Sequence, residues 1–181
     1  KTLGGTRNKL DSREVNYTYY PNNLLNTVTD SAGGYSKNYY DKNGNIIKIL
    51  TLRNEGKYDI QKYEYDAMNR KTKDIKLLEK NNIFNTAGMA GYERLTDLEY
   101  PDMIAVITAY EYDILGNLKR EIQPKAFECA LDDEKNIEKY IINYSYDALN
   151  RLERVTRKYN DVDASATYQY DELGNMTREI N

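Results

Sequence analysis

The 181-residue sequence contains no histidine and no tryptophan, one cysteine, three prolines and two phenylalanines. Without histidine, Ser-His and Cys-His catalytic pairs and His-ligated metal sites are excluded. The lone Cys129 excludes a disulfide within the chain, and we expect a buried, unreactive thiol. No apolar run reaches membrane-spanning length, and no signal peptide is present. Because it begins at Lys1 and stops just after a repeated phrase, we expect a fragment of a longer protein.

Charge is nearly balanced, with 26 basic and 29 acidic residues and a formal net charge of -3. This balance does not favour nucleic-acid binding, which needs a field of positive charge. Hydrophobic residues make up 40% of the chain, so the composition does not predict disorder. The 19 tyrosines favour half-exposed β-sheets, because a tyrosine ring packs while its hydroxyl stays in water.

One phrase recurs along the chain. It reads "YEYDAMNRKTKDI" from Tyr63, "YEYDILGNLKREI" from Tyr110, "YSYDALNRLERVT" from Tyr144 and "YQYDELGNMTREI" from Tyr168. The tyrosine before each aspartate is Tyr40, Tyr65, Tyr112, Tyr146 or Tyr170, with spacings of 25, 47, 34 and 24 residues. The longest spacing predicts a degenerate unit near residues 85–95, and "YTYYPNNLL" from Tyr17 is another degenerate copy. A period this short is typical of one β-hairpin per repeat.

The phrase has the composition of a hairpin loop. Aspartate, which favours the first position of a type I turn, stands at Asp41, Asp66, Asp113, Asp147 and Asp171. Three residues later only glycine or asparagine occurs, at Gly44, Asn69, Gly116, Asn150 and Gly174. These two residues best tolerate a positive φ. A type I turn followed by a left-handed residue is therefore predicted at each copy.

Counting outward from these turns predicts the cross-strand neighbours. Each aspartate should face Asn45, Arg70, Asn117, Arg151 or Asn175, and the tyrosine before it Ile46, Lys71, Leu118, Leu152 or Met176. Tyr63, Tyr110, Tyr144 and Tyr168 should face Lys73, Arg120, Arg154 and Arg178, with Lys48 opposite Asn38 in the same position. The tyrosine rows are a candidate binding face.

The predicted fold is all-β, built of tandem antiparallel β-hairpin repeats that form a continuous curved or spiralling sheet. We expect a single array over residues 1–181, with units near 17–30, 38–52, 63–80, 100–122, 139–156 and 168–180. The segment 124–140 breaks the pattern and is expected to form a helical turn or a long loop.

The phrase Y-x-Y-D-x-x-G/N-N/R-L, together with "YPDM" at Tyr100–Met103, resembles the YD repeat of RHS proteins. The resemblance covers about residues 17–180 and implies an arc of a hollow shell in a secreted or cell-surface protein, often around a toxin. Flanking repeats or an encapsulated segment would then be the partners. The RHS core block is absent, so the resemblance transfers no catalytic residue.

Other sites fit the sequence less well. "DKNGN" at Asp41 begins like a calcium-binding loop, but such a loop needs glycine and glutamate where Ile46 and Leu52 stand. Asp132, Asp133 and Glu134 are interpreted as a solvated acidic loop rather than a cation site. The glycosylation pattern at Asn16, Asn143 and Asn175 is attributed to chance. We expect no cofactor and no metal.

Three functions remain open. The first is a structural scaffold that encloses or displays another segment. The second is a carbohydrate- or protein-binding module that uses exposed tyrosine rows. The third is an enzyme, for which a carboxylate pair of the glycosidase type is not excluded by counting. Because each repeated aspartate has a role in a turn, we expect no enzymatic activity.

Overall fold

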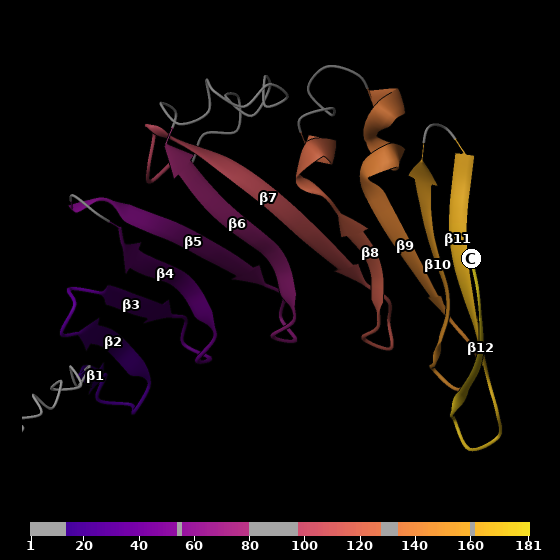
Figure 1. Ribbon diagram of the computed structural model, residues 1–181, viewed down its shortest axis with the longest axis horizontal. Coiled ribbons are helices and arrows are strands. Elements are labelled where there is room, and N and C mark those ends of the chain that lie inside the picture. The colour runs from indigo at the N-terminus through magenta and orange to yellow at the C-terminus, as the bar shows by residue number, and fades with distance from the viewer. Residues whose placement is uncertain (1–13, 54–55, 80–97, 128–133, 160–161) are drawn as a thin grey trace, which may run out of the picture. The chain divides into compact units, whose positions relative to one another are not determined.

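A computed structural model describes residues 14–53, 56–79, 98–127, 134–159 and 162–181 (Figure 1). The predicted all-β class with antiparallel hairpins is confirmed for these residues, since the strand pairs from β1 to β4 and from β5 to β12 are antiparallel. The chain divides into two compact units, of which the first ends at Asp59 and the second begins at Ile60.

The first unit contains two repeat hairpins. Its strands are β1 (Val15–Tyr19), β2 (Leu25–Asp30), β3 (Tyr35–Tyr40) and β4 (Ile46–Leu52). They pair in chain order, β1 with β2, β2 with β3 and β3 with β4. The degenerate copy at Tyr17 and the copy ending at Asp41 are therefore adjacent hairpins.

The second unit contains four repeat hairpins, again in chain order. Its strands are β5 (Tyr58–Tyr65, which belongs to this unit from Ile60), β6 (Lys71–Glu79), β7 (Met103–Tyr112), β8 (Leu118–Ile122), β9 (Ile141–Tyr146), β10 (Leu152–Tyr159), β11 (Val162–Tyr170) and β12 (Met176–Ile180). Their four repeat loops lie along one end of the sheet, the lower end in Figure 1. Residues equivalent in the repeat are thereby brought close to one another.

The longest helical segments among the described residues lie in the connection between β8 and β9. Residues 124–127 form a helical turn, and η4 (Glu134–Tyr140) is a 3-10 helix that leads into β9. Both lie at the end of the sheet opposite the repeat loops (Figure 1). Residues 128–133, with Cys129 and the acidic pair Asp132 and Asp133, fall outside the described residues, as does the degenerate unit expected near 85–95.

The core of the second unit is small. Its buried apolar side chains among the described residues are Ile60, Ile75, Leu77, Ile104, Ala105, Ala126 and Ile141. Most other strand residues there are half-buried, as expected for a sheet that is rich in tyrosine, threonine and charged residues. The cross-strand contacts between side chains therefore carry much of the stabilisation.

The register differs from the prediction at one position in every hairpin. The tyrosine before each aspartate faces the predicted residue, but a β-bulge then shifts the ladder by one. The residues skipped by the ladder are Asn26, Ile47, Thr72, Lys119, Glu153 and Thr177. A bulge places two residues opposite one, so every later side chain moves by one place.

The predicted aromatic-cation pairs were wrong for this reason. Lys73 faces Glu64, Arg120 faces Glu111, Arg154 faces Ser145, Arg178 faces Gln169 and Lys48 faces Tyr39. Two of these pairs are ion pairs, at 2.8 Å for Lys73–Glu64 and 3.1 Å for Arg120–Glu111. Lys48, which was predicted opposite Asn38, instead faces an aromatic residue, with its ammonium 4.7 Å from the centre of the Tyr39 ring.

Candidate functional site

The repeated loop has one geometry in all five copies with an aspartate. In the first, the Asp41 amide donates to the Asn45 carbonyl at 3.0 Å and the Gly44 amide donates to the Asp41 carbonyl at 3.2 Å. The third loop residue has a positive φ each time, 87° at Gly44, 60° at Asn69, 94° at Gly116, 67° at Asn150 and 86° at Gly174. Only glycine and asparagine accept this conformation at low cost, which explains why the position holds nothing else.

The aspartate side chain stabilises the loop by accepting hydrogen bonds from later residues of the same loop. At Asp147, one carboxylate oxygen accepts from the amides of Leu149 and Arg151, both at 2.9 Å, and the other accepts from Arg151 Nε at 2.7 Å. At Asp171 the second oxygen accepts instead from Asn175 Nδ2 at 2.9 Å. Several hydrogen bonds donated to a carboxylate favour its ionised form.

These contacts lower the pKa of all five loop aspartates below the ordinary value of 3.8. The side-chain amide of the fifth residue is the largest cause of the low pKa at Asp41, Asp113 and Asp171. The backbone amide of the arginine at that position is the largest cause for the pKa of Asp66 and Asp147. Each carboxylate is thus an ionised structural acceptor rather than a proton donor at neutral pH.

Two further loops have the same hydrogen bonds. Asp30–Gly34 connects β2 to β3, with the Asp30 amide 3.0 Å from the Gly34 carbonyl and a φ of 88° at Gly33. Sequence reasoning missed this loop, although an aspartate followed three residues later by glycine is visible in "DSAGG". The degenerate copy at Tyr20 keeps the geometry without an aspartate, and Asn23 takes the positive φ of 68°.

In four copies, the tyrosine that precedes the aspartate joins its hairpin to the one before it. In the second unit Tyr112 Oη donates to the Lys71 carbonyl at 2.8 Å, Tyr146 Oη to the Leu118 carbonyl at 3.0 Å and Tyr170 Oη to the Leu152 carbonyl at 2.8 Å. In the first unit Tyr40 Oη donates to the Leu25 carbonyl at 2.9 Å. Each acceptor stands immediately before a bulged residue, where the ladder is interrupted. The repeated tyrosine is thus an inter-hairpin hydrogen-bond donor.

Arginine adds a second contact between hairpins. The guanidinium of Arg151 lies 4.7 Å from the centre of the Tyr170 ring, and its Nη1 donates to the Asp171 carbonyl at 3.0 Å. Arg70 makes the equivalent contacts with the Tyr112 ring, at 4.7 Å, and the Asp113 carbonyl, at 3.3 Å. Since Nε of each arginine also binds the aspartate of its own loop, one planar side chain connects two loops.

The loops alternate in type along the chain. Gly-Asn loops at Gly44, Gly116 and Gly174 alternate with Asn-Arg loops at Asn69 and Asn150. In the second unit the arginine of each Asn-Arg loop donates a hydrogen bond to the next Gly-Asn loop along the chain. The Gly-Asn loop at Gly116 contacts the next loop through its asparagine instead, since Asn117 Nδ2 donates to Asn150 Oδ1. This alternation is visible in the sequence, but its meaning depends on which loops are neighbours.

The tyrosines predicted as a binding face are largely engaged within the sheet. The Lys71 ammonium lies 5.2 Å from the Tyr63 ring centre and 5.4 Å from that of Tyr110, while Tyr144 Oη donates to Glu121 at 3.4 Å. Desolvation, followed by nearby carboxylates, raises the pKa of all three hydroxyls above 10.0. Two of these ring faces therefore have an ammonium neighbour.

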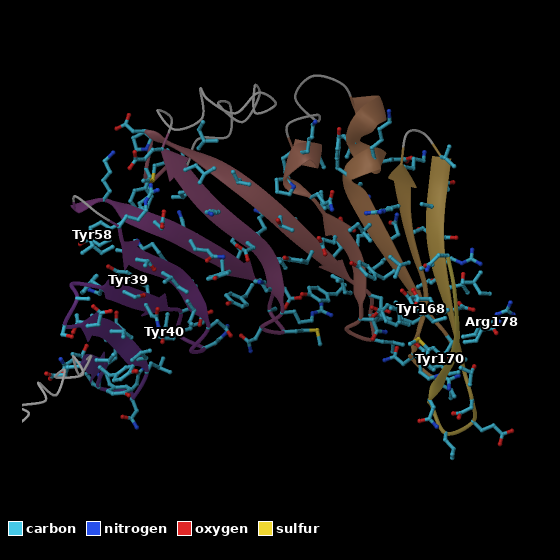
Figure 2. The ribbon with its side chains drawn as sticks, viewed as in Figure 1. Tyr39, Tyr40, Tyr58, Tyr168, Tyr170 and Arg178 are labelled. Atoms are coloured by element: carbon cyan, nitrogen blue, oxygen red, sulfur yellow. The ribbon has the colours of Figure 1, made fainter. Side chains whose placement is uncertain are left out.

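Tyr144 and Tyr168 border a hollow of about 690 Å³ on β9, β10 and β11, together with Ile142, Val155 and Ala166. Figure 2 places Tyr168 on β11 with Tyr170 closer to the loop. The register places Tyr144 opposite Val155 and Val155 opposite Ala166. This hollow borders two of the four predicted tyrosines, and Tyr63 lines a smaller hollow of about 390 Å³.

The described residues contain no group of three or more potential metal ligands among His, Cys, Asp and Glu. No helix among them is both long and apolar enough to cross a membrane. Asp41, at the sequence that begins like a calcium loop, directs its carboxylate to Asn43 and Asn45 of its own turn.

No protein-family model and no curated protein matches the chain. Among solved structures, the TcdB2-TccC3-Cdc42 crystal structure aligns at 16% identity and a TM-score of 0.43 over 91% of this chain and 9% of that one. The Tc holotoxin pore of Photorhabdus luminescens aligns at 17% identity and a TM-score of 0.40 over 93% of this chain and 10% of that one. The chain thus spans about a tenth of these much longer chains. At these identities and TM-scores the matches assign neither a family nor a function.

Proposed function

We propose that the chain is an architectural segment, a stretch of a hairpin-repeat scaffold whose recurring phrase couples neighbouring hairpins within each unit. The observation that carries this proposal is the use of the motif residues. Asp147 binds its own loop, Arg151 binds its own loop and the next, and Tyr170 binds the previous hairpin. The aspartate, the arginine and the tyrosine of this motif therefore each have a structural partner.

The finer proposal is an arc of an RHS or YD-type shell that encloses or displays another segment of a secreted or cell-surface protein. Its support is the YD motif and the coupling of successive hairpins. Flanking repeats or the enclosed segment are the proposed partners, with no nucleic acid. We also propose that the chain is not an enzyme and uses no cofactor, because the repeated carboxylates are acceptors within their own loops.

Protease protection tests the scaffold proposal. The chain is co-expressed with the segment that adjoins it in its parent protein, and the digestion rate of that segment is measured. We expect slower digestion with the native chain than with a variant in which Arg70 and Arg151 are both glutamine, since these arginines couple neighbouring loops. Equal digestion with and without the chain would contradict enclosure. Hydrolysis of a glycan or peptide, abolished by one carboxylate substitution, would contradict the non-enzymatic assignment.

A binding module is the second candidate, favoured by the hollow beside Tyr144 and Tyr168. Its aromatic and aliphatic side chains, which lie beside the charged Arg157 and Asp163, suit a protein segment or the apolar face of a sugar ring. Tyr168→Ala should abolish capture of such a ligand on a glycan or peptide array. Tyr63→Ala is the matched control, because its position in the repeat is the same but it lies outside this hollow.

A further inference from the structure

β1 and β12 are the first and last strands of the described chain, and each pairs with one neighbour among the described residues. β1 pairs with β2, and β12, an outer strand of the second unit in Figure 1, pairs with β11. Every residue of these two strands is exposed, including Tyr19 at 58% and Met176 at 57%. An exposed strand edge is a template for pairing with another strand.

The β12 edge repeats the accepting side of the contact between hairpins. The first residues of β8 and β10, Leu118 and Leu152, each accept a tyrosine hydroxyl from the following hairpin at their carbonyl. Met176 is the first residue of β12, and no tyrosine of the described chain donates to its carbonyl. Asn117 donates to the asparagine of positive φ in the next loop, and Asn175 holds the same position in the loop before β12. β12 therefore presents the surface that a further hairpin of this type would contact.

The hairpin of β1 and β2 repeats the other side of that contact. Tyr19 is the last residue of β1, as Tyr146 is of β9, and its hydroxyl has no partner among the described residues. In the loop that follows, Asn23 has the positive φ of 68°. Asn150, which accepts from the preceding loop, has the same conformation at 67°. This hairpin thus has the two groups that the β12 edge would bind.

A third contact fits the same pairing. Tyr144 Oη donates to the Glu121 carboxylate of the preceding hairpin at 3.4 Å. Tyr17 and Glu179 hold the equivalent positions on β1 and β12. Both are exposed, and neither side chain has a hydrogen bond or ion pair within the described part of the chain. The two edges are therefore complementary at three positions of the repeat.

We propose that β12 of one chain pairs with β1 of a second copy. In this interface the Tyr19 hydroxyl of the second copy donates to the Met176 carbonyl, and Asn175 donates to Asn23 of the second copy. The proposal rests on the coupling of hairpins in the proposed function and extends it from one chain to two. Because the two surfaces differ, the interface is heterologous, and each added copy leaves a further edge for the next.

The repeats also determine the register of this pairing. Arg120 pairs with Asn143 between β8 and β9. Arg178 and Asn16 hold these two positions on β12 and β1, counted from Met176 and Tyr19 respectively. Arg178 of one chain therefore lies opposite Asn16 of the next, on the same face of the joined sheet.

Sedimentation velocity of the 181-residue chain over a range of concentrations tests the association. We expect the average mass to rise with concentration and to pass that of a dimer. Tyr19→Phe should weaken association about twofold to tenfold, because it removes one hydrogen bond. Tyr168→Phe is the matched control, since Tyr168 lies on β11, one strand inside the edge, and should leave association unchanged. A mass that stays monomeric, or an equal effect of the two variants, would overturn the proposal.

Disulfide cross-linking tests which strands meet and in which register. Chains that carry Cys129→Ser and one new cysteine are mixed in air, which oxidises neighbouring thiols. Arg178→Cys should cross-link to Asn16→Cys, because directly opposite Cβ atoms lie about 4.5–5.5 Å apart. Val15→Cys is the matched control, since adjacent side chains of a strand point to opposite faces. Equal cross-linking of Arg178→Cys to itself or to Val15→Cys, or none to Asn16→Cys, would contradict the pairing.

These results are separable from the scaffold proposal. Protease protection of the adjoining segment without cross-linking would overturn the edge pairing and leave the enclosure standing. Cross-linking without protection would overturn the enclosure and leave the edge pairing standing. Far-UV circular dichroism of each variant, with a melting temperature equal to that of the native chain at low concentration, shows that the variant folds.

Discussion

Replacing Asn150 by valine should destabilise the chain far more than the same change at the adjacent Leu149. Asn150 has a φ of 67°, whereas Leu149 is 70% exposed and has no special backbone conformation. A β-branched side chain in the left-handed region costs about 1–3 kcal/mol. An exposed loop side chain such as Leu149 changes the free energy of unfolding by about 0.5 kcal/mol or less.

A second effect adds to the backbone strain. The side chain of Asn150 accepts a hydrogen bond from Asn117 of the preceding repeat hairpin, and valine cannot replace it. A neutral hydrogen bond contributes about 0.5–1.5 kcal/mol, and an exposed one falls toward the lower end. Asn150→Gly loses the same hydrogen bond but accepts the positive φ, so it separates the two effects. The expected order of destabilisation is Asn150→Val, then Asn150→Gly, then Leu149→Val.

Urea and thermal denaturation, followed by far-UV circular dichroism, measure these differences. In a chain of this size, each kcal/mol corresponds to a shift of about 2–4 °C in the melting temperature. Equal midpoints for Asn150→Val and Leu149→Val would refute the reasoning from backbone conformation. A glycine variant as unstable as the valine variant would instead assign the whole effect to the lost hydrogen bond.

Three further predictions concern the contacts between loops. Tyr170→Phe should lower the free energy of unfolding by about 0.5–1.5 kcal/mol, because its hydroxyl donates to the Leu152 carbonyl, while Tyr168→Phe should be nearly neutral because no described residue accepts from that hydroxyl; urea midpoints compare the two. Arg151→Lys should lower the melting temperature more than Arg178→Lys, since lysine cannot bind two loops and stack on an aromatic ring at once, and equal shifts would contradict the coupling role. The folded pKa of Asp147 lies below its ordinary 3.8, so its contribution to stability is full above about pH 5 and is lost as the pH falls through the folded value. Asp147→Asn should therefore flatten the fall in urea midpoint between about pH 5 and pH 2.

The loops could be predicted from the sequence because their causes are local. An aspartate three residues before a glycine or asparagine contains both the acceptor that closes the turn and the residue that tolerates a positive φ. The order of the strands also follows, since consecutive hairpins joined by short connections pair with their neighbours. The predicted cross-strand partner of the tyrosine before each aspartate was also correct, because this position lies directly beside the turn.

The tertiary structure decided what happens beyond the loop. The bulges at Thr72 and Glu153 place the basic residue that follows on the face of the sheet opposite to the predicted one. The bulged residues differ in type from repeat to repeat, so no local sequence signal predicts the bulge. The contacts of Arg70 with Asp113 span 43 positions, so they exist only once two hairpins lie side by side. The local sequence therefore determined where the chain turns, whereas pairing between strands decided which side chains meet.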